Sequence, residues 1–345
     1  MAIASDNFAH HISLAHHLQG GRCQEPLTIM KAIQITEFGG PEKMALIDIA
    51  DPVPSDGEVL LDVLKIGINY ADTHQVENSY LSAQTLPLIP GIEVVGKTPD
   101  GKRFLALVSS GGYAEKATAN KGAMIPIPDA VSDEDALCML VQGSTAWHVL
   151  KTMAHQKPGE SVVIHAAAGG VGVIAIQLAK LWGAKVIAVA SSQEKRDLAL
   201  SLGADIAINA NESDLKAAIV AANGGKKVDI VLEMVGGPTF DRSLESLAHF
   251  GRLITYGMAS RVAATSIAPG ALMAGTKSVS GFWLAHCFGK KELFHDVIAE
   301  LFAMIAAGTL RPVIGARFGL SEAVQAHQQM RARGSIGKIT LDPQR

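Results

Sequence analysis

A short glycine-rich segment between two apolar runs carries the residues whose spacing most directly indicates chemistry. The run 162–164 leads into Ala167, Gly169 and Gly172, and an almost wholly apolar stretch continues to Gly183. Glycines allow the backbone N–H groups at a helix N-terminus to approach a phosphate, and the helix dipole favours its negative charge. The pattern is the dinucleotide fingerprint G-x-G-x-x-G with Ala167 in the first position. It predicts a strand–turn–helix unit that binds a dinucleotide; the alternative is a tight turn without a ligand.

The residues after the next apolar run, 185–190, indicate which dinucleotide is bound. An NAD-binding unit usually has Asp or Glu about 20 residues after the glycines, where it binds the ribose 2′-hydroxyl. Here Ser191 and Ser192 occupy that place, and the cations Lys195 and Arg196 follow closely. Hydroxyls and positive charge suit a 2′-phosphate. NADPH is therefore the predicted cofactor, and the alternative is that Lys195 and Arg196 only begin a solvated helix.

The elements that must position these residues alternate between strand and helix. After the first strand and the glycine turn, we predict strands at 185–190, 205–209, 228–235, 252–256 and 278–284. Helices are predicted between them at 194–202, 213–222 and 239–247. This count and spacing predict an α/β fold with a doubly wound parallel sheet.

The chain before this unit has a different pattern, with short apolar runs, turn residues and no helical periodicity. We predict strands there at 31–35, 44–49, 58–64, 91–96, 103–108 and 113–117, which together indicate a β-barrel-like domain. Helices are predicted at 132–135, 144–153 and 293–307, and a strand at 337–341 that returns to the first domain. The predicted organisation is one domain from 30–142 with 286–345, and a nucleotide-binding domain from 143–285.

Composition narrows the class of protein. The chain has 345 residues, 48% of them hydrophobic and 18% charged, as expected for a folded enzyme. A net charge of −3 gives no basic face for nucleic acid. The three cysteines are far apart and indicate neither a disulfide framework nor a structural zinc site. No apolar run reaches the roughly 18 residues of a membrane helix, so no membrane partner and a cytoplasmic location are expected.

Residues 1–29 do not resemble the rest of the chain. They contain two histidine pairs and a single cation, Arg22. A signal peptide needs a basic start and an apolar core, and a transit peptide needs several arginines, so neither is indicated. We predict a flexible extension or an upstream start codon, with metal binding by the histidine pairs as the alternative.

Several motifs together resemble the zinc-independent branch of the medium-chain dehydrogenase/reductase superfamily, and most closely its NADPH:quinone oxidoreductases. The most specific motifs are Ile68–Asp72, Pro90–Glu93, Gly143–Ala146, Ala166–Gly172 and Gly337–Lys338. The resemblance extends over residues 30–341 and implies a GroES-like β-barrel catalytic domain interrupted by a Rossmann domain. The cofactor is then expected in the cleft between the two domains.

Zinc-dependent members of that superfamily have metal ligands that are missing here. They carry a cysteine near the segment 69–72 and Gly-His-Glu where this chain has Gly91-Ile92-Glu93. We therefore expect no metal site, and the resemblance implies hydride transfer to a quinone or similar conjugated carbonyl rather than alcohol oxidation. The chain also departs from the quinone reductase pattern. Val76 and Glu77 stand where relatives often have an arginine, and Ala210 replaces a tyrosine near the adenosine.

The resemblance implies catalytic roles for five residues that could position the substrate or stabilise its developing oxyanion. They are Asn69, Tyr70, His74, Tyr80 and Thr145. The alternatives are structural: Asn69 and Thr145 could be caps, Tyr70 a core residue and His74 a surface residue. The expected cofactor contacts are Thr145, Ala168, Gly169, Gly170, Val171, Gly172, Ser191, Ser192, Lys195, Val235, Tyr256, Gly257, Phe282, Trp283 and Lys338.

Two other functions remain open from the sequence. Enoyl reduction uses the same hydride donor but also needs a positioned proton source. A nucleotide-binding protein without turnover would need only the cofactor site. The uncharged run 278–284 would be the outermost strand of the parallel sheet, and its composition predicts pairing with a second copy. A homodimer is therefore expected.

Overall fold

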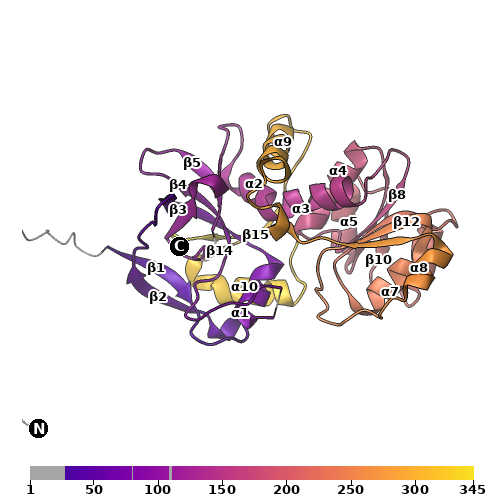
Figure 1. Cartoon of the computed structure of the whole chain (residues 1–345), viewed down its shortest axis with the longest axis horizontal. Coiled ribbons are helices and arrows are strands. Elements are labelled where there is room, and N and C mark those ends of the chain that lie inside the picture. Colours follow the sequence, from indigo (N-terminus) through magenta and orange to yellow (C-terminus); the bar gives the residue numbers. More distant parts are fainter. Residues whose placement is uncertain (1–27, 80, 109–110) are drawn as a thin grey trace, which may run out of the picture.

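The computed structural model describes residues 28–79, 81–108 and 111–345, so Tyr80 and most of the N-terminal extension lie outside the described residues. Two sheet-containing bodies lie side by side (Figure 1), the first coloured mainly indigo and yellow and the second magenta to orange. The first contains a seven-stranded sheet with a separate β-ribbon, and the second contains a six-stranded sheet. Among the described residues no helix is both long and apolar enough to cross a membrane.

The sheet of the second body is parallel throughout. Its strands are β8 (Ser161–His165), β9 (Lys185–Ala190), β10 (Ile206–Asn209), β11 (Val228–Glu233), β12 (Leu247–Thr255) and β13 (Ser278–Gly281). Their spatial order is β10-β9-β8-β11-β12-β13, with every pairing parallel. This is the order of a doubly wound dinucleotide-binding fold, whose direction of winding reverses between β8 and β11. The predicted fold class is confirmed.

Helices cover both faces of this sheet. Successive side chains of a strand point to opposite faces, so each strand packs against helices on both sides. On one face Val162 and Ile164 pack against α4 (Gly170–Leu181), and on the other Val163 packs with α6 (Leu215–Ala222) and α7 (Gly237–Ser246). The remaining helices of this body are α5 (Gln193–Ser201) and α8 (Pro269–Gly275). Both faces being buried explains why the strands read as unbroken apolar runs.

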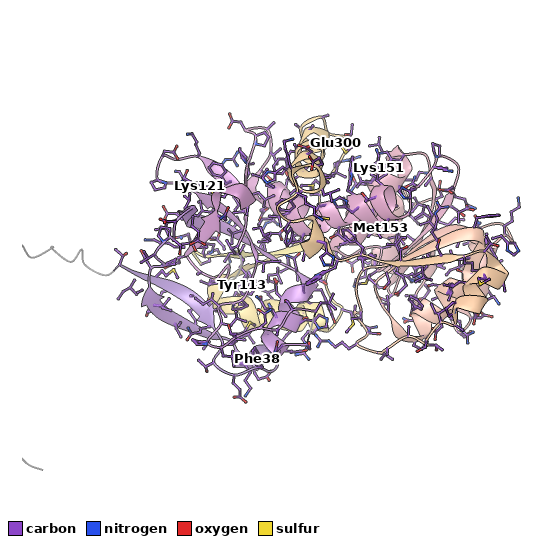
Figure 2. The ribbon with its side chains drawn as sticks, in the orientation of Figure 1. Phe38, Tyr113, Lys121, Lys151, Met153 and Glu300 are labelled. Atoms are coloured by element: carbon purple, nitrogen blue, oxygen red, sulfur yellow. The ribbon has the colours of Figure 1, made fainter. Side chains whose placement is uncertain are left out.

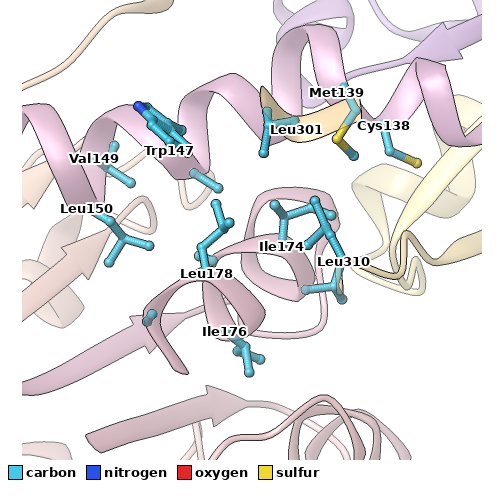
Figure 3. Packing of buried hydrophobic residues seen from close by; sticks show 14 of the residues in the cluster. Cys138, Met139, Trp147, Val149, Leu150, Ile174, Ile176, Leu178, Leu301 and Leu310 are labelled. Atoms are coloured by element: carbon cyan, nitrogen blue, oxygen red, sulfur yellow. The ribbon is translucent and has the colours of Figure 1, made fainter. Parts of the chain in front are cut away.

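The two helices predicted around residues 132–153 form one continuous helical segment. It comprises α2 (Asp133–Cys138), a π-helical turn (Met139–Gly143), α3 (Ser144–Trp147) and a second π-helical turn (His148–Met153). Gly143 does not interrupt it, because its backbone is helical (φ −67°, ψ −49°). A Cβ at this position would lie 3.0 Å from Met139 Sδ and 3.1 Å from Leu301. The glycine thus permits close packing. Figure 3 shows this segment lying over α4, with Met139 and Leu150 on the side towards Ile174 and Leu178.

The mixed sheet of the first body receives strands from both ends of the chain. Its order is β14-β15-β3-β4-β5-β7, and β6 also pairs with β3. The strands are β3 (Glu58–Ile68), β4 (Glu93–Lys97), β5 (Arg103–Leu107), β6 (Lys116–Asn120), β7 (Met124–Pro126), β14 (Ile314–Gly319) and β15 (Lys338–Asp342). The ribbon is β1 (Ile29–Gln34) and β2 (Ala45–Ala50). Pairing of β15 with β3 confirms that the C-terminal strand returns to this body.

Two helices of the first body were not expected from the sequence. The structure has α1 (Tyr70–Glu77) and α10 (Ala323–Arg331) besides the predicted C-terminal helix α9 (His295–Ala306). Helix α1 shows no apolar face, because its buried residues include the polar Asp72, Thr73 and His74. Sequence patterns indicate a helix by the spacing of its apolar residues, and this segment has no such spacing. Some of these buried side chains have hydrogen-bond partners in distant segments, as Asp72 has in Tyr113.

Candidate active site

A cleft of about 780 Å³ lies between the two bodies and is lined by residues of both. This volume is within the range of pockets that bind cofactors and small molecules. The glycine turn after β8 forms one wall, and α1 with the loop before β4 forms another. The cleft therefore lies at the carboxyl ends of the parallel strands, next to the position where the winding reverses.

The glycine turn leaves no space for side chains. A Cβ on Gly172 would lie 2.5 Å from the Ala167 carbonyl oxygen, and one on Gly170 would lie 2.1 Å from the Gln142 side chain. Gly169 is the extended N-cap residue of α4, and its N–H donates to Ala166 O at 2.8 Å. The first N–H groups of α4 consequently line the cleft without covering side chains, as a pyrophosphate site requires.

Near the end of β9, where the sequence predicts binding of a 2′-phosphate, the cleft is lined by Ser191, Lys195 and Arg333. The sequence did not indicate Arg333. Lys195 Nζ donates to Arg333 O at 2.5 Å, and burial lowers the pKa of this lysine. Ser192 does not line the cleft; its hydroxyl instead accepts from Lys195 N and caps α5. Arg196 is also engaged elsewhere, donating to Ala190 O at 3.3 Å.

Later strand ends supply the rest of the expected cofactor wall. Val235, Tyr256, Gly257, Phe282 and Trp283 line the cleft, as do Ala168 and Val171 of the glycine turn. Glu233, at the end of β11, shapes this region because its Oε1 accepts from Val235 N at 2.7 Å and Gly236 N at 2.9 Å. Burial raises the pKa of this carboxyl.

Four of the five expected catalytic residues meet in the cleft: Asn69, Tyr70, His74 and Thr145. Tyr70 Oη donates to Ala259 O at 3.0 Å and so joins α1 to the loop after β12. His74 Nδ1 lies 2.9 Å from Ser79 Oγ, and burial lowers the pKa of the imidazole. Thr145 lies inside the continuous helical segment and is therefore not a helix cap. Tyr80, the fifth, lies outside the described residues.

Asn69 and Lys338 form a buried polar cluster with Glu93 beside the cleft. Lys338 Nζ donates to Asn69 Oδ1 at 2.9 Å and also pairs with Glu93, whose Oε2 accepts from Asn69 Nδ2 at 2.9 Å. Lys338 and Glu93 are both 0% exposed. The structure thus places Lys338 behind Asn69 and not on the cleft, contrary to the expected cofactor contact. Its neighbour Gly337 lines the cleft and donates its N–H to Ala168 O at 2.8 Å.

Gln142 is a second residue of the site that sequence reasoning missed. It is 8% exposed and lines the cleft against Gly170. Its Oε1 is buried and has no hydrogen-bond partner among the described residues. An unsatisfied buried polar atom is costly, so a ligand that supplies a donor here would be favoured. Its position just before the motif 143–146 was the only signal in the sequence.

Two features together define the class of this protein. A Rossmann sheet with a glycine turn shares its cleft with a catalytic body built around a GroES-like fold, as in the medium-chain dehydrogenases/reductases. Family models agree, since residues 55–102 match an alcohol dehydrogenase GroES-like domain and residues 170–303 match a zinc-binding dehydrogenase domain.

Similar proteins place the chain more narrowly. It is 34% identical to a quinone oxidoreductase of Sus scrofa, over 91% of this chain and 98% of that protein. It is 31% identical to quinone oxidoreductase 1 of Escherichia coli K12, over 90% and 99% respectively. The structure of an E. coli quinone oxidoreductase complexed with NADPH matches with a TM-score of 0.86 and 30% identity, over 91% of this chain and 100% of that one. The chain belongs to the quinone oxidoreductase family.

Proposed function

We infer that the protein is an NADPH-dependent oxidoreductase that transfers a hydride to a quinone. The observation that carries this conclusion is the shared cleft, with a phosphate-binding turn and cationic groups at one end and Tyr70, His74 and Thr145 at the other. Relatives named quinone oxidoreductases and similar structures complexed with NADPH support it. Quinones accept a hydride readily, so the protein mainly has to hold two rings within reach of each other.

The residues of the cofactor end fit NADPH. We propose that the N–H groups of α4 bind the pyrophosphate and that Lys195, Ser191 and Arg333 bind the 2′-phosphate. Gln142 Oε1 would accept from a hydroxyl or amide of the cofactor. When bound, NADPH supplies the hydride.

The residues of the substrate end would orient the quinone and stabilise negative charge on its oxygen. Tyr70 Oη and Thr145 Oγ1 are hydroxyl donors in the cleft. His74 has a lowered pKa and is neutral near pH 7, so it would act by hydrogen bonding rather than by charge. Tyr70 would release Ala259 O when it donates to substrate, which would link substrate binding to the loop after β12.

We propose that this chemistry proceeds without zinc. At the positions where zinc-dependent relatives have ligands, Asn69 is bonded to Glu93 and Lys338, and Ile92 is apolar. Glu93 is itself neutralised by Lys338. This donor set does not suit a zinc ion, which prefers thiolate, imidazole and free carboxylate. In the described part of the chain no other group of three His, Cys, Asp or Glu residues could hold a metal.

A panel of acceptors tests the proposed function. NADPH oxidation should be fast with benzoquinones and naphthoquinones and slow with α,β-unsaturated ketones and thioesters. Faster turnover of the enones would favour enoyl reduction. NADPH binding without turnover of any acceptor would favour a nucleotide-binding role and refute the proposal.

The organisation of the chain and its assembly are also proposals. We propose domains 30–142 with 286–345, and 143–285, so that the first boundary falls within the continuous helical segment. We further propose a homodimer formed through β13, the outermost strand of its sheet. Phe282 and Trp283 line the cleft of their own chain, so the dimer contact is expected from 278–281 alone.

A further inference from the structure

A buried carboxyl group borders the cleft, and the roles proposed so far make no use of it. Asp72 lies in the first turn of α1, is 1% exposed and lines the cleft. Its Oδ2 accepts from Asn69 N at 2.9 Å and from Tyr113 Oη at 2.9 Å. Two donors on one oxygen fix the orientation of the carboxyl group.

The hydrogen-bonded chain continues away from the cleft. Tyr113 Oη also lies 2.9 Å from His327 Nε2, which belongs to α10, and both side chains are completely buried. Figure 2 shows Tyr113 inside the first body. His327 Nδ1 has no partner among the described residues. Burial lowers the pKa of His327 to about 4, so this imidazole is neutral at physiological pH. Because the one hydroxyl proton of Tyr113 is donated to Asp72, His327 Nε2–H donates to Tyr113 Oη.

The surroundings of Asp72 favour its protonated form. Burial raises its pKa to about 7, an effect opposed by the hydrogen bonds from Asn69 N and Tyr113 and by the charge of Lys338. The carboxylate of Glu93 acts in the same direction as burial. This carboxyl group therefore keeps its proton to a higher pH than an ordinary aspartate, whose pKa is about 4.

Reduction of a quinone needs such a proton. Addition of a hydride leaves a hydroquinone monoanion, and one proton completes the hydroquinone. We propose that Asp72 is the proton donor to this anion and that Tyr113 and His327 position it. The O–H bond of Asp72 breaks, its proton bonds to the phenolate oxygen, and the electron pair remains on the carboxylate. Solvent returns a proton before the next turnover. Phenols have pKa values near 10, so this transfer is favourable.

The inference rests on the proposed quinone reduction, and the variant Asp72→Asn tests it. The amide oxygen of asparagine can still accept from Asn69 N and Tyr113, so thermal unfolding and the Kd for NADPH should change little. The variant has no acidic proton, and kcat for quinone reduction at pH 6 should fall by roughly 100-fold, the scale of general acid catalysis. Asp62→Asn, which changes an exposed carboxylate on β3, is the matched control and should retain the wild-type rate.

The pH dependence separates a proton donor from a merely structural residue. Wild-type kcat should decline above about pH 7 as Asp72 loses its proton, and Asp72→Asn should lack this decline. Tyr113→Phe removes a hydrogen bond that lowers the pKa of Asp72, so its decline should move to higher pH. In the ligand-free protein, the carboxyl carbon of Asp72 should titrate near pH 7 by ¹³C NMR.

The inference is overturned, and the proposed function stands, if the wild type reduces quinones but Asp72 titrates near pH 4. The same conclusion follows if the decline in kcat above about pH 7 persists unchanged in Asp72→Asn. Failure of the wild type to reduce any quinone would instead overturn the proposed function, and this inference with it.

Discussion

Replacing Lys195 with alanine is the sharpest test of the cofactor site. Lys195 lies in the first turn of α5, the helix that follows β9, and its Nζ donates to Arg333 O at 2.5 Å. An ammonium group has three donors, so it can keep this bond and still reach a 2′-phosphate. Hydrogen bonds to charged groups contribute about 1.5–3 kcal/mol, and partial exposure reduces this figure to about 1–2 kcal/mol. The Kd for NADPH should therefore rise by roughly 5- to 30-fold.

The Kd for NADH measures whether the loss is specific, because NADH has a 2′-hydroxyl in place of the phosphate. Fluorescence titration should show an almost unchanged Kd for NADH in the same variant. Arg196→Ala is the matched control, since this cation is one residue away and donates to Ala190 O and Gln193 Oε1. It should leave both affinities unchanged. Equal weakening of NADPH and NADH by Lys195→Ala would refute the assignment of the 2′-phosphate site.

Three further predictions concern the metal, the assembly and the buried ion pair. Exhaustive chelation should leave quinone reduction intact, and activity that is lost to a chelator and restored by zinc would contradict the proposed mechanism. Light scattering should show a dimer at micromolar concentration, and Val279→Pro should shift it towards monomer because proline removes a β13 donor; a monomeric wild type would disprove the edge contact. Lys338→Met should cost about 3–5 kcal/mol in urea unfolding because Glu93 remains buried and unpaired, and adding Glu93→Leu should recover much of that loss. A small loss of unfolding free energy in Lys338→Met, as expected if Glu93 becomes exposed in that variant, would argue against this account.

The sequence predicted the nucleotide-binding body well because its signals are local. Strand β9 was predicted with its observed bounds, 185–190, and the parallel order follows from alternating strands and helices. The glycine turn was equally readable, since Gly170 and Gly172 are required by contacts within the turn or with the adjacent helical segment. Most of the expected cleft residues also meet there, because parallel strands bring their carboxyl ends to one edge.

Helix α1 shows where local patterns stop being informative. Its hydrophobic and polar residues have no helical period, yet Asp72 and His74 are buried. Asp72 accepts a hydrogen bond from Tyr113, which is 41 residues away, and His327 joins this contact from the other end of the chain. No window of sequence contains both halves of such a contact.

The sequence by itself determined the fold class, the glycine turn and the absence of a carboxylate directly after β9, where the first one is Glu194. Only the tertiary structure decided which side chains line the cleft near the end of β9, since Arg333 reaches it from the C-terminal segment and Ser192 turns away to cap a helix. It also placed Lys338 against Asn69 and Glu93, 269 and 245 residues away in the chain. The reason is physical: a turn or a buried strand is specified by neighbouring residues, whereas the partner of a buried charge is specified by how distant segments pack.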